Sequence, residues 1–314
     1  KYKTGVKMPI NEKQTENKTS SSSTQPYSKA ERPVGSSMKW SEVDEARADV
    51  KETFGLIPTF LNNFTDQSMP GAWSEVKNLR FGSNTALDLK LKSLIGLAVA
   101  AQIPCDRISY YDQKSSLTEG ASQQEQLEAV LMAGLTRHWS TVLHGLQIDQ
   151  DEFRKEVDKV MTHVKKMMEE SRGKMPTEDM FLIKPTTPEE TYKDIEKTLG
   201  IVPKFFRNFA KEGIAGAWST FKGLQLNPFT SLSGKEKELI GLAVSAQIPC
   251  SYCVYFHRNA ATLNGASERE MREAVSIAAL ARQWSTVFHG PQIDLESFKK
   301  DADSMMERSP ERSH

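Results

Sequence analysis

The chain repeats itself at a fixed offset of 145 residues, and this repeat limits its possible folds more than any other feature. Short identical or near-identical segments recur at that offset along most of the chain. The matched pairs include 55–58 with 200–203, 71–74 with 216–219, 95–99 with 240–244, 101–105 with 246–250 and 139–142 with 284–287. A gapless repeat this long indicates a duplicated domain rather than a solenoid of small units. We expect two copies, at residues 39–172 and 186–310. The linker that joins them, at 173–185, carries Gly and Pro breakers.

Each copy carries the apolar spacing of helices, and alternating strand patterns are scarce. In the second copy Leu239, Leu242, Ala243 and Ala246 share a helical face, and an amphipathic stripe beginning at Phe153 closes the first copy. Ser267 followed by Glu270 is typical of a capping box. The sequence therefore predicts an all-α protein, with two tandem bundles of roughly six helices each.

The remaining segments and the overall charge restrict the partners. Residues 1–38 are polar, with a serine run and no hydrophobic period, and predict a disordered tether. The chain holds 41 basic and 41 acidic residues, so no basic field favours nucleic acid. No apolar run approaches the roughly 20 residues that a membrane-spanning helix needs. The polar tether and the start at Lys1 favour an exported or periplasmic protein whose signal was removed over a cytoplasmic one.

Four residues of the second copy form a pattern typical of thiol redox chemistry. Glu238 is followed after eleven residues by Cys250, then by Cys253 three positions on and by His257 four positions later. On a helix starting near Pro249, the two thiols and the imidazole share one face. The helix N-terminus lowers thiol pKa, and a neighbouring histidine supplies a base that Glu238 could orient.

This spacing resembles the signature of alkylhydroperoxidase D-like proteins, within the carboxymuconolactone decarboxylase superfamily. The resemblance implies that Cys253 attacks a hydroperoxide, that Cys250 resolves the sulfenic acid as a disulfide, and that His257 and Glu238 relay protons. It also implies no bound cofactor or metal, an external dithiol or thioredoxin-like reductant, and self-association into a homo-oligomer. Better-studied members carry a histidine immediately before the second cysteine, where this chain has Tyr252.

The first copy lacks most of this pattern. At the same offset Ser93 replaces the glutamate, Ile108 the second cysteine and Asp112 the histidine, while Cys105 alone persists. We expect this copy to have no thiol cycle of its own and to serve packing, site shaping or a partner surface. Cys105 is expected to be a small buried side chain, with a disulfide to the cysteines of the second copy or a regulatory thiol as the alternatives.

Several alternatives stay open at this point. The two cysteines could form part of a metal site or be inert. The protein could be a decarboxylase-type acid/base enzyme of the same superfamily, or a non-enzymatic assembly module with a vestigial site. Tyr252 could contact a substrate or pack at a helix junction, with packing favoured. His144 and His289, each before a glycine, are expected to lie at helix ends capped by that glycine, with a role in a pocket as the alternative.

Overall fold

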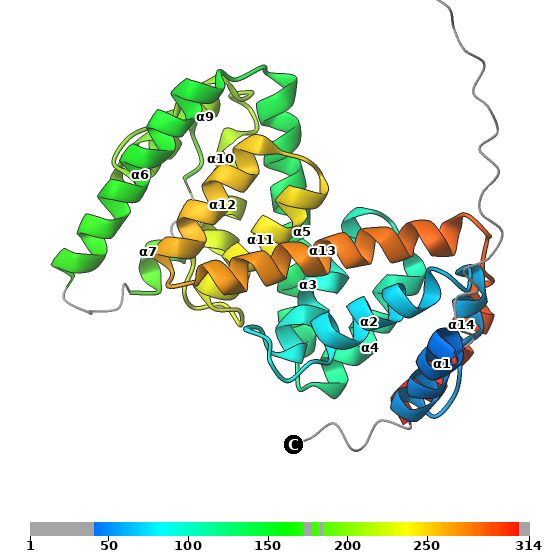
Figure 1. The fold of residues 1–314 in the computed structure, drawn as a ribbon. Coiled ribbons are helices and arrows are strands. Elements are labelled where there is room, and N and C mark those ends of the chain that lie inside the picture. Colours follow the sequence, from blue (N-terminus) through cyan, green and yellow to red (C-terminus); the bar gives the residue numbers. More distant parts are fainter. Residues whose placement is uncertain (1–40, 172–176, 183–184, 308–314) are drawn as a thin grey trace, which may run out of the picture. The chain divides into compact units, whose positions relative to one another are not determined.

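The protein is all-α, as predicted, in a computed structural model that describes residues 41–171, 177–182 and 185–307 (Figure 1). No strand occurs among these residues. The first copy contains α1 (Ser41–Phe54), a 3₁₀ helix η1 (Thr59–Asn63), α2 (Met69–Arg80), α3 (Leu89–Gln102), α4 (Asp106–Thr118), α5 (Gln123–Gly145) and α6 (Gln150–Glu170). The second contains α8 (Pro188–Leu199), α9 (Lys204–Asn208), α10 (Ile214–Phe221), a π-helical turn η2 (Lys222–Leu226), α11 (Gly234–Gln247), α12 (Ser251–Leu263), α13 (Glu268–His289) and α14 (Leu295–Glu307). The expected tether at 1–38 lies outside the described residues, and the expected linker contains the short helix α7 (Asp179–Leu182).

The duplication is visible in the local structure of the two copies. The capping box at Ser267 and Glu270 forms as predicted, and Ser122 and Glu125 form its counterpart in the first copy. These side chains satisfy amide groups at the helix start, which fixes where α5 and α13 begin.

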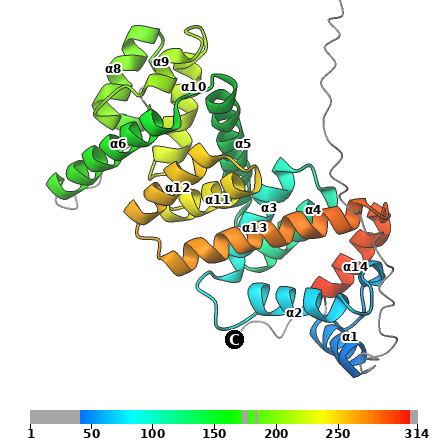
Figure 2. The ribbon, with the colours of Figure 1, turned by 45° about the horizontal axis from the view of Figure 1, so that its top comes forward.

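The centre of the fold is made by both copies together. Helices α3 and α11 are buried over almost their whole length, and they pack against each other (Figure 2). Helix α5 packs on α11 of the other copy as well as on α3, and α13 packs on α3 as well as on α11. The described residues of both copies accordingly form one compact unit with a shared hydrophobic core.

The last helix of each copy covers the other copy. Helix α6 packs on α12, and α14 packs on α4. Equivalent tyrosine–aspartate hydrogen bonds stabilise both contacts. The Tyr255 hydroxyl donates to Asp158 at 2.6 Å, and the Tyr110 hydroxyl donates to Asp303 at 2.8 Å. The two copies therefore exchange their closing helices.

Two buried carboxylates reinforce this exchange. Glu128 on α5 accepts hydrogen bonds from the backbone amides of Ser231 and Leu232 at 2.9 and 2.8 Å. Glu273, its counterpart on α13, accepts in the same way from the amides at positions 86 and 87 of the first copy. Each carboxylate fixes the loop that leads into the central helix of the opposite copy.

The ends of α5 and α13 agree in part with the expected glycine caps. His144 and His289 each lie in the last turn of their helix, and Gly290 is the C-cap of α13, with a right-handed φ of −56°. In α5 the prediction was wrong, because the helix continues through Gly145 and its C-cap is Leu146. The left-handed residues are Gln147 and Gln292, two positions after each glycine, with φ of 49° and 55°.

Candidate active site

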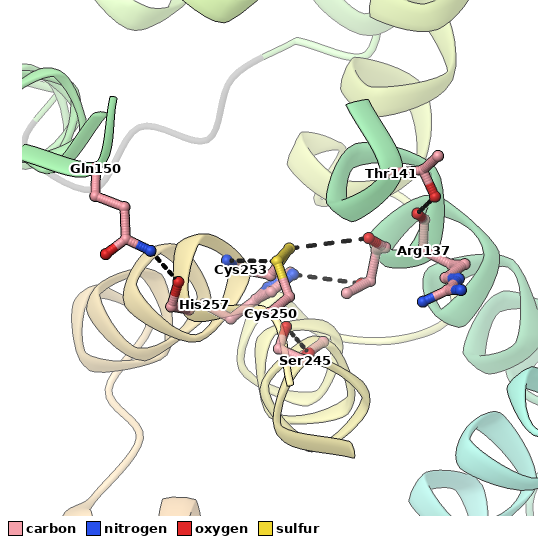
Figure 3. The surroundings of a disulfide bond; sticks show 10 residues. Arg137, Thr141, Gln150, Ser245, Cys250, Cys253 and His257 are labelled. Atoms are coloured by element: carbon pink, nitrogen blue, oxygen red, sulfur yellow. Dashed lines mark hydrogen bonds between the residues drawn. A yellow bond between two sulfur atoms is a disulfide. The ribbon is translucent and has the colours of Figure 1, made fainter. Parts of the chain in front are cut away.

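The four predicted residues of the second copy lie together at the junction of α11 and α12. Figure 3 shows three of them, Cys250, Cys253 and His257. Cys250 is the N-cap of α12, and its sulfur accepts a hydrogen bond from the Cys253 amide at 3.2 Å. The two cysteines form a disulfide, with Cα atoms 5.3 Å apart. Both sulfurs therefore lie at the positive end of a 13-residue helix, where a thiolate is stabilised once the bond is reduced.

Glu238 and His257 form a buried pair beside the disulfide. A Glu238 carboxylate oxygen lies 2.7 Å from Nδ1 of His257, and both residues are less than 5% exposed. The other carboxylate oxygen accepts from the Gln225 amide at 3.0 Å. An ionised Glu238 requires a proton on Nδ1, so Nε2 of the neutral imidazole is left as the proton acceptor.

Thr136 belongs to the first copy, but it contacts the site of the second. Its hydroxyl lies 3.3 Å from Nε2 of His257, and its carbonyl oxygen lies 4.0 Å from the Cys253 sulfur. Thr136 lies on α5, which packs on both α11 and α12. The first copy thus places a hydroxyl group against the imidazole and a backbone carbonyl near the sulfur.

The close approach of α11 and α12 depends on Gly241. A Cβ atom at this position would lie 2.3 Å from Cε1 of His257, far inside van der Waals contact. Gly96 occupies the same position in the first copy, where a Cβ would lie 2.0 Å from a carboxylate oxygen of Asp112. Glycine is needed in each copy because the side chain of the facing helix fills the space.

Tyr252 packs at a helix junction. Its hydroxyl donates to the carbonyl of Ile148, and its ring lies edge-on to those of His144 and Phe153 at 5.1 and 5.3 Å. The hydroxyl is thus directed to the backbone of the first copy. The favoured interpretation of Tyr252 agrees with this geometry.

In the first copy a buried ion pair occupies the corresponding place. The Arg80 guanidinium donates to Asp112 and, at 3.3 Å, to the Ser93 hydroxyl. Arg80 is the counterpart of Gln225 and Asp112 that of His257. Burial raises the pKa of Asp112 to about 6, although the neighbouring guanidinium opposes the rise. Cys105 is fully buried and free, as expected for a small core side chain.

Sequence reasoning missed three residues of this site: Gln225, Thr136 and Gly241. Gly241 lies in one of the repeated segments, and its identity in both copies was a usable signal. Thr136 corresponds to Ala281 at the repeat offset. This difference between the copies points to the site only when it is combined with the packing of α5 on α12. No cluster of three or more metal-ligating side chains occurs among the described residues.

The helices of residues 41–171, 177–182 and 185–307 include none with the length and apolar character needed to cross a membrane.

Comparisons with known proteins agree with the fold and with the resemblance found in the sequence. Residues 214–291 match the model of the carboxymuconolactone decarboxylase family. A solved structure from Burkholderia xenovorans, assigned as a gamma-carboxymuconolactone decarboxylase subunit, is similar with a TM-score of 0.53 and 15% sequence identity. That similarity covers 80% of this chain and 95% of the other. No curated protein sequence matches the chain.

The resemblance to this superfamily is thereby confirmed for residues 214–291, which match the carboxymuconolactone decarboxylase family model and hold the disulfide and its Glu–His pair.

Proposed function

We propose that the second copy is a thiol-dependent oxidoreductase that reduces organic hydroperoxides at the Cys250–Cys253 pair. The observation that carries this proposal is the disulfide at the start of α12 with a buried glutamate–histidine pair beside it. A disulfide at a helix N-terminus next to a base is suited to cycling between dithiol and disulfide.

The proposed cycle has three balanced steps. The Cys253 thiolate attacks the outer oxygen of the hydroperoxide, the O–O bond breaks, and an alcohol leaves with a proton while Cys253 becomes a sulfenic acid. The Cys250 thiol then displaces water from that sulfenic acid and forms the disulfide. An external dithiol reduces the disulfide by two exchange steps and is itself oxidised to a disulfide.

The surrounding residues support the proton transfers of this cycle. We expect the hydroxyl of Thr136, 3.3 Å from Nε2 of His257, to relay the thiol proton to the imidazole. Glu238 balances the imidazolium charge, and Gln225 holds the carboxylate in place. Because the pair is buried, its charges are screened little by solvent.

The cycle is tested by mass spectrometry of the reduced full chain after one equivalent of tert-butyl hydroperoxide. We expect loss of two hydrogens at the Cys250–Cys253 peptide, reversed by a dithiol. The Cys250→Ser variant should instead accumulate a Cys253 sulfenic acid that dimedone traps. The Cys105→Ser variant is the matched control and should behave as the natural chain. Undiminished peroxide turnover by Cys253→Ser would refute the proposal.

A second candidate is acid/base decarboxylation of a lactone, which the family match favours. In that reaction His257 and Glu238 would act on substrate and the cysteines would be dispensable. A Cys250→Ser/Cys253→Ser double variant distinguishes the two functions, since it keeps the buried pair and removes the thiols. Decarboxylation of a muconolactone by this variant would support the second candidate.

A further inference from the structure

The first copy contains an apolar cavity where the second copy has its disulfide site. The cavity has a volume of about 80 Å³, and its wall includes Arg80, Ile108 and Ala281. These three are the counterparts of Gln225, Cys253 and Thr136. The rest of the wall is apolar or aromatic and comes from both copies, with Trp284 and Phe298 contributed by the second.

A difference in side-chain size accounts for space at this position. At the site of the second copy, Trp139 of the first copy lies against the rings of Phe206 and Phe221, with centroids 5.0 and 6.3 Å away. The corresponding residues of the first copy are Leu61 and Val76, and both line the cavity. Two aromatic rings are thus replaced by smaller aliphatic side chains around the equivalent tryptophan.

Two residues of the cavity wall carry hydrogen-bond donors without an acceptor. Nε of Arg80 and the indole N–H of Trp284 are buried and have no partner within the described part of the chain. Each residue is 8% exposed. A buried donor left unsatisfied costs about 1–3 kcal/mol, so an acceptor entering the cavity gains that amount back.

The charge balance of the cavity favours a neutral acceptor. Arg80 is already paired with Asp112, and together they carry no net charge. An anion would add an unbalanced charge in a buried place, which costs far more than a neutral group does. An amine or alcohol would bring further donors that the apolar wall does not accept.

We infer that the first copy binds a small, uncharged carbonyl compound in this cavity, with its oxygen accepting from Arg80 or Trp284. An apolar cavity of ~150 Å³ holds benzene, which has six non-hydrogen atoms, so about half that volume suits a ligand of about three to four non-hydrogen atoms. This site is separate from the thiol chemistry of the second copy, and its test is independent of that function.

The probe is acetone labelled with ¹³C at its carbonyl, titrated into the full chain at pH 8 and followed by ¹³C NMR. We expect saturable binding with a millimolar Kd and a carbonyl shift in the direction of stronger hydrogen bonding. Acetate has the same number of non-hydrogen atoms and should bind at least tenfold more weakly at this pH. The absence of saturable acetone binding up to about 50 mM, or equal binding of both probes, would overturn the inference.

Variants locate the site. Val76→Phe introduces the residue of the second copy, fills the cavity and should abolish binding, whereas Val164→Phe, the same change on α6, should leave it intact. Leu61→Phe is the alternative filling variant if Val76→Phe does not fold. The double variant Arg80→Gln/Asp112→Asn removes the ion pair without leaving a buried charge alone, and should lose the carbonyl shift. Unchanged binding in folded Val76→Phe and Leu61→Phe would place the ligand elsewhere and refute the proposal.

Discussion

Replacing Thr136 by valine is the sharpest test of the contribution of the first copy to the site of the second. Valine keeps the shape of threonine and the backbone carbonyl near Cys253, but it removes the hydroxyl that faces Nε2 of His257. The change therefore isolates one hydrogen bond in a buried site.

The expected effect follows from the geometry of that bond. At 3.3 Å it is long for a hydrogen bond, but it is buried, and a bond of this kind contributes about 0.5–1.5 kcal/mol. If the bond is kept in the transition state, its loss slows thiol oxidation roughly 2- to 12-fold. In the reduced protein we expect the same hydroxyl to donate to the Cys253 thiolate, so its loss should also raise the pKa of that thiol.

Two measurements follow the change in the reduced protein. Stopped-flow fluorescence gives the rate of disulfide formation with tert-butyl hydroperoxide. Alkylation by iodoacetamide across pH gives the midpoint of thiolate formation, which should move to higher pH in Thr136→Val. A purely structural role of Thr136 would lower the free energy of unfolding without moving that midpoint.

The controls lie on the same helix. Thr136→Ser keeps the hydroxyl and should restore both the rate and the midpoint. Thr141→Val removes a hydroxyl that bonds only within α5, to the carbonyl of Arg137, and should change neither. If Thr136→Val and Thr136→Ser oxidise at the rate of the natural chain with the same midpoint, Thr136 takes no part in proton transfer.

Three further predictions concern the neighbouring structure. Gly241→Ala should displace the His257 ring and slow peroxide reduction on the order of 100-fold, as measured by steady-state turnover. Gly223→Ala serves as the control, because no atom lies within 4 Å of the Cβ that it adds. Equal turnover by the two variants would contradict the steric argument. Burial raises the pKa of Asp112 from 3.8 to about 6, so the folded state holds the proton more tightly than the unfolded state. Stability relative to Asp112→Asn should therefore fall by about 2 kcal/mol between pH 4 and pH 7, and parallel urea-unfolding profiles would refute this. Tyr252→Phe should cost about 1 kcal/mol in unfolding free energy and leave peroxide turnover unchanged; a large loss of turnover would mean that its hydroxyl acts on substrate.

Local patterns in the sequence were enough for the helices and for part of the site. The repeat, the capping box and the spacing from Glu238 to His257 can each be recognised in the sequence alone. The capping box and the Glu238–His257 pair also depend on residues close to one another along the chain. Spacing along two adjacent helices fixes which side chains meet when the helices pack as a hairpin, as α11 and α12 do.

The contribution of Thr136 could not be predicted in this way. It lies 121 residues from His257 along the chain, and no periodicity in either copy reports that α5 packs on α12. The exchange of α6 and α14 was invisible for the same reason, because an amphipathic stripe shows that a helix is covered but not by what. The cavity beside Arg80 depends on side-chain volumes contributed by both copies, which the sequence of either copy does not specify.

The exchange of helices between the copies has an evolutionary consequence. In a dimer of identical single domains, any residue that supports the neighbouring site must also appear beside its own, so the two sites can change only together. Fusing the copies in one chain removes that constraint: threonine can occupy position 136 while alanine occupies 281. One cavity can then specialise while the other keeps the thiols, yet neither half can be separated, because each still closes the other's core.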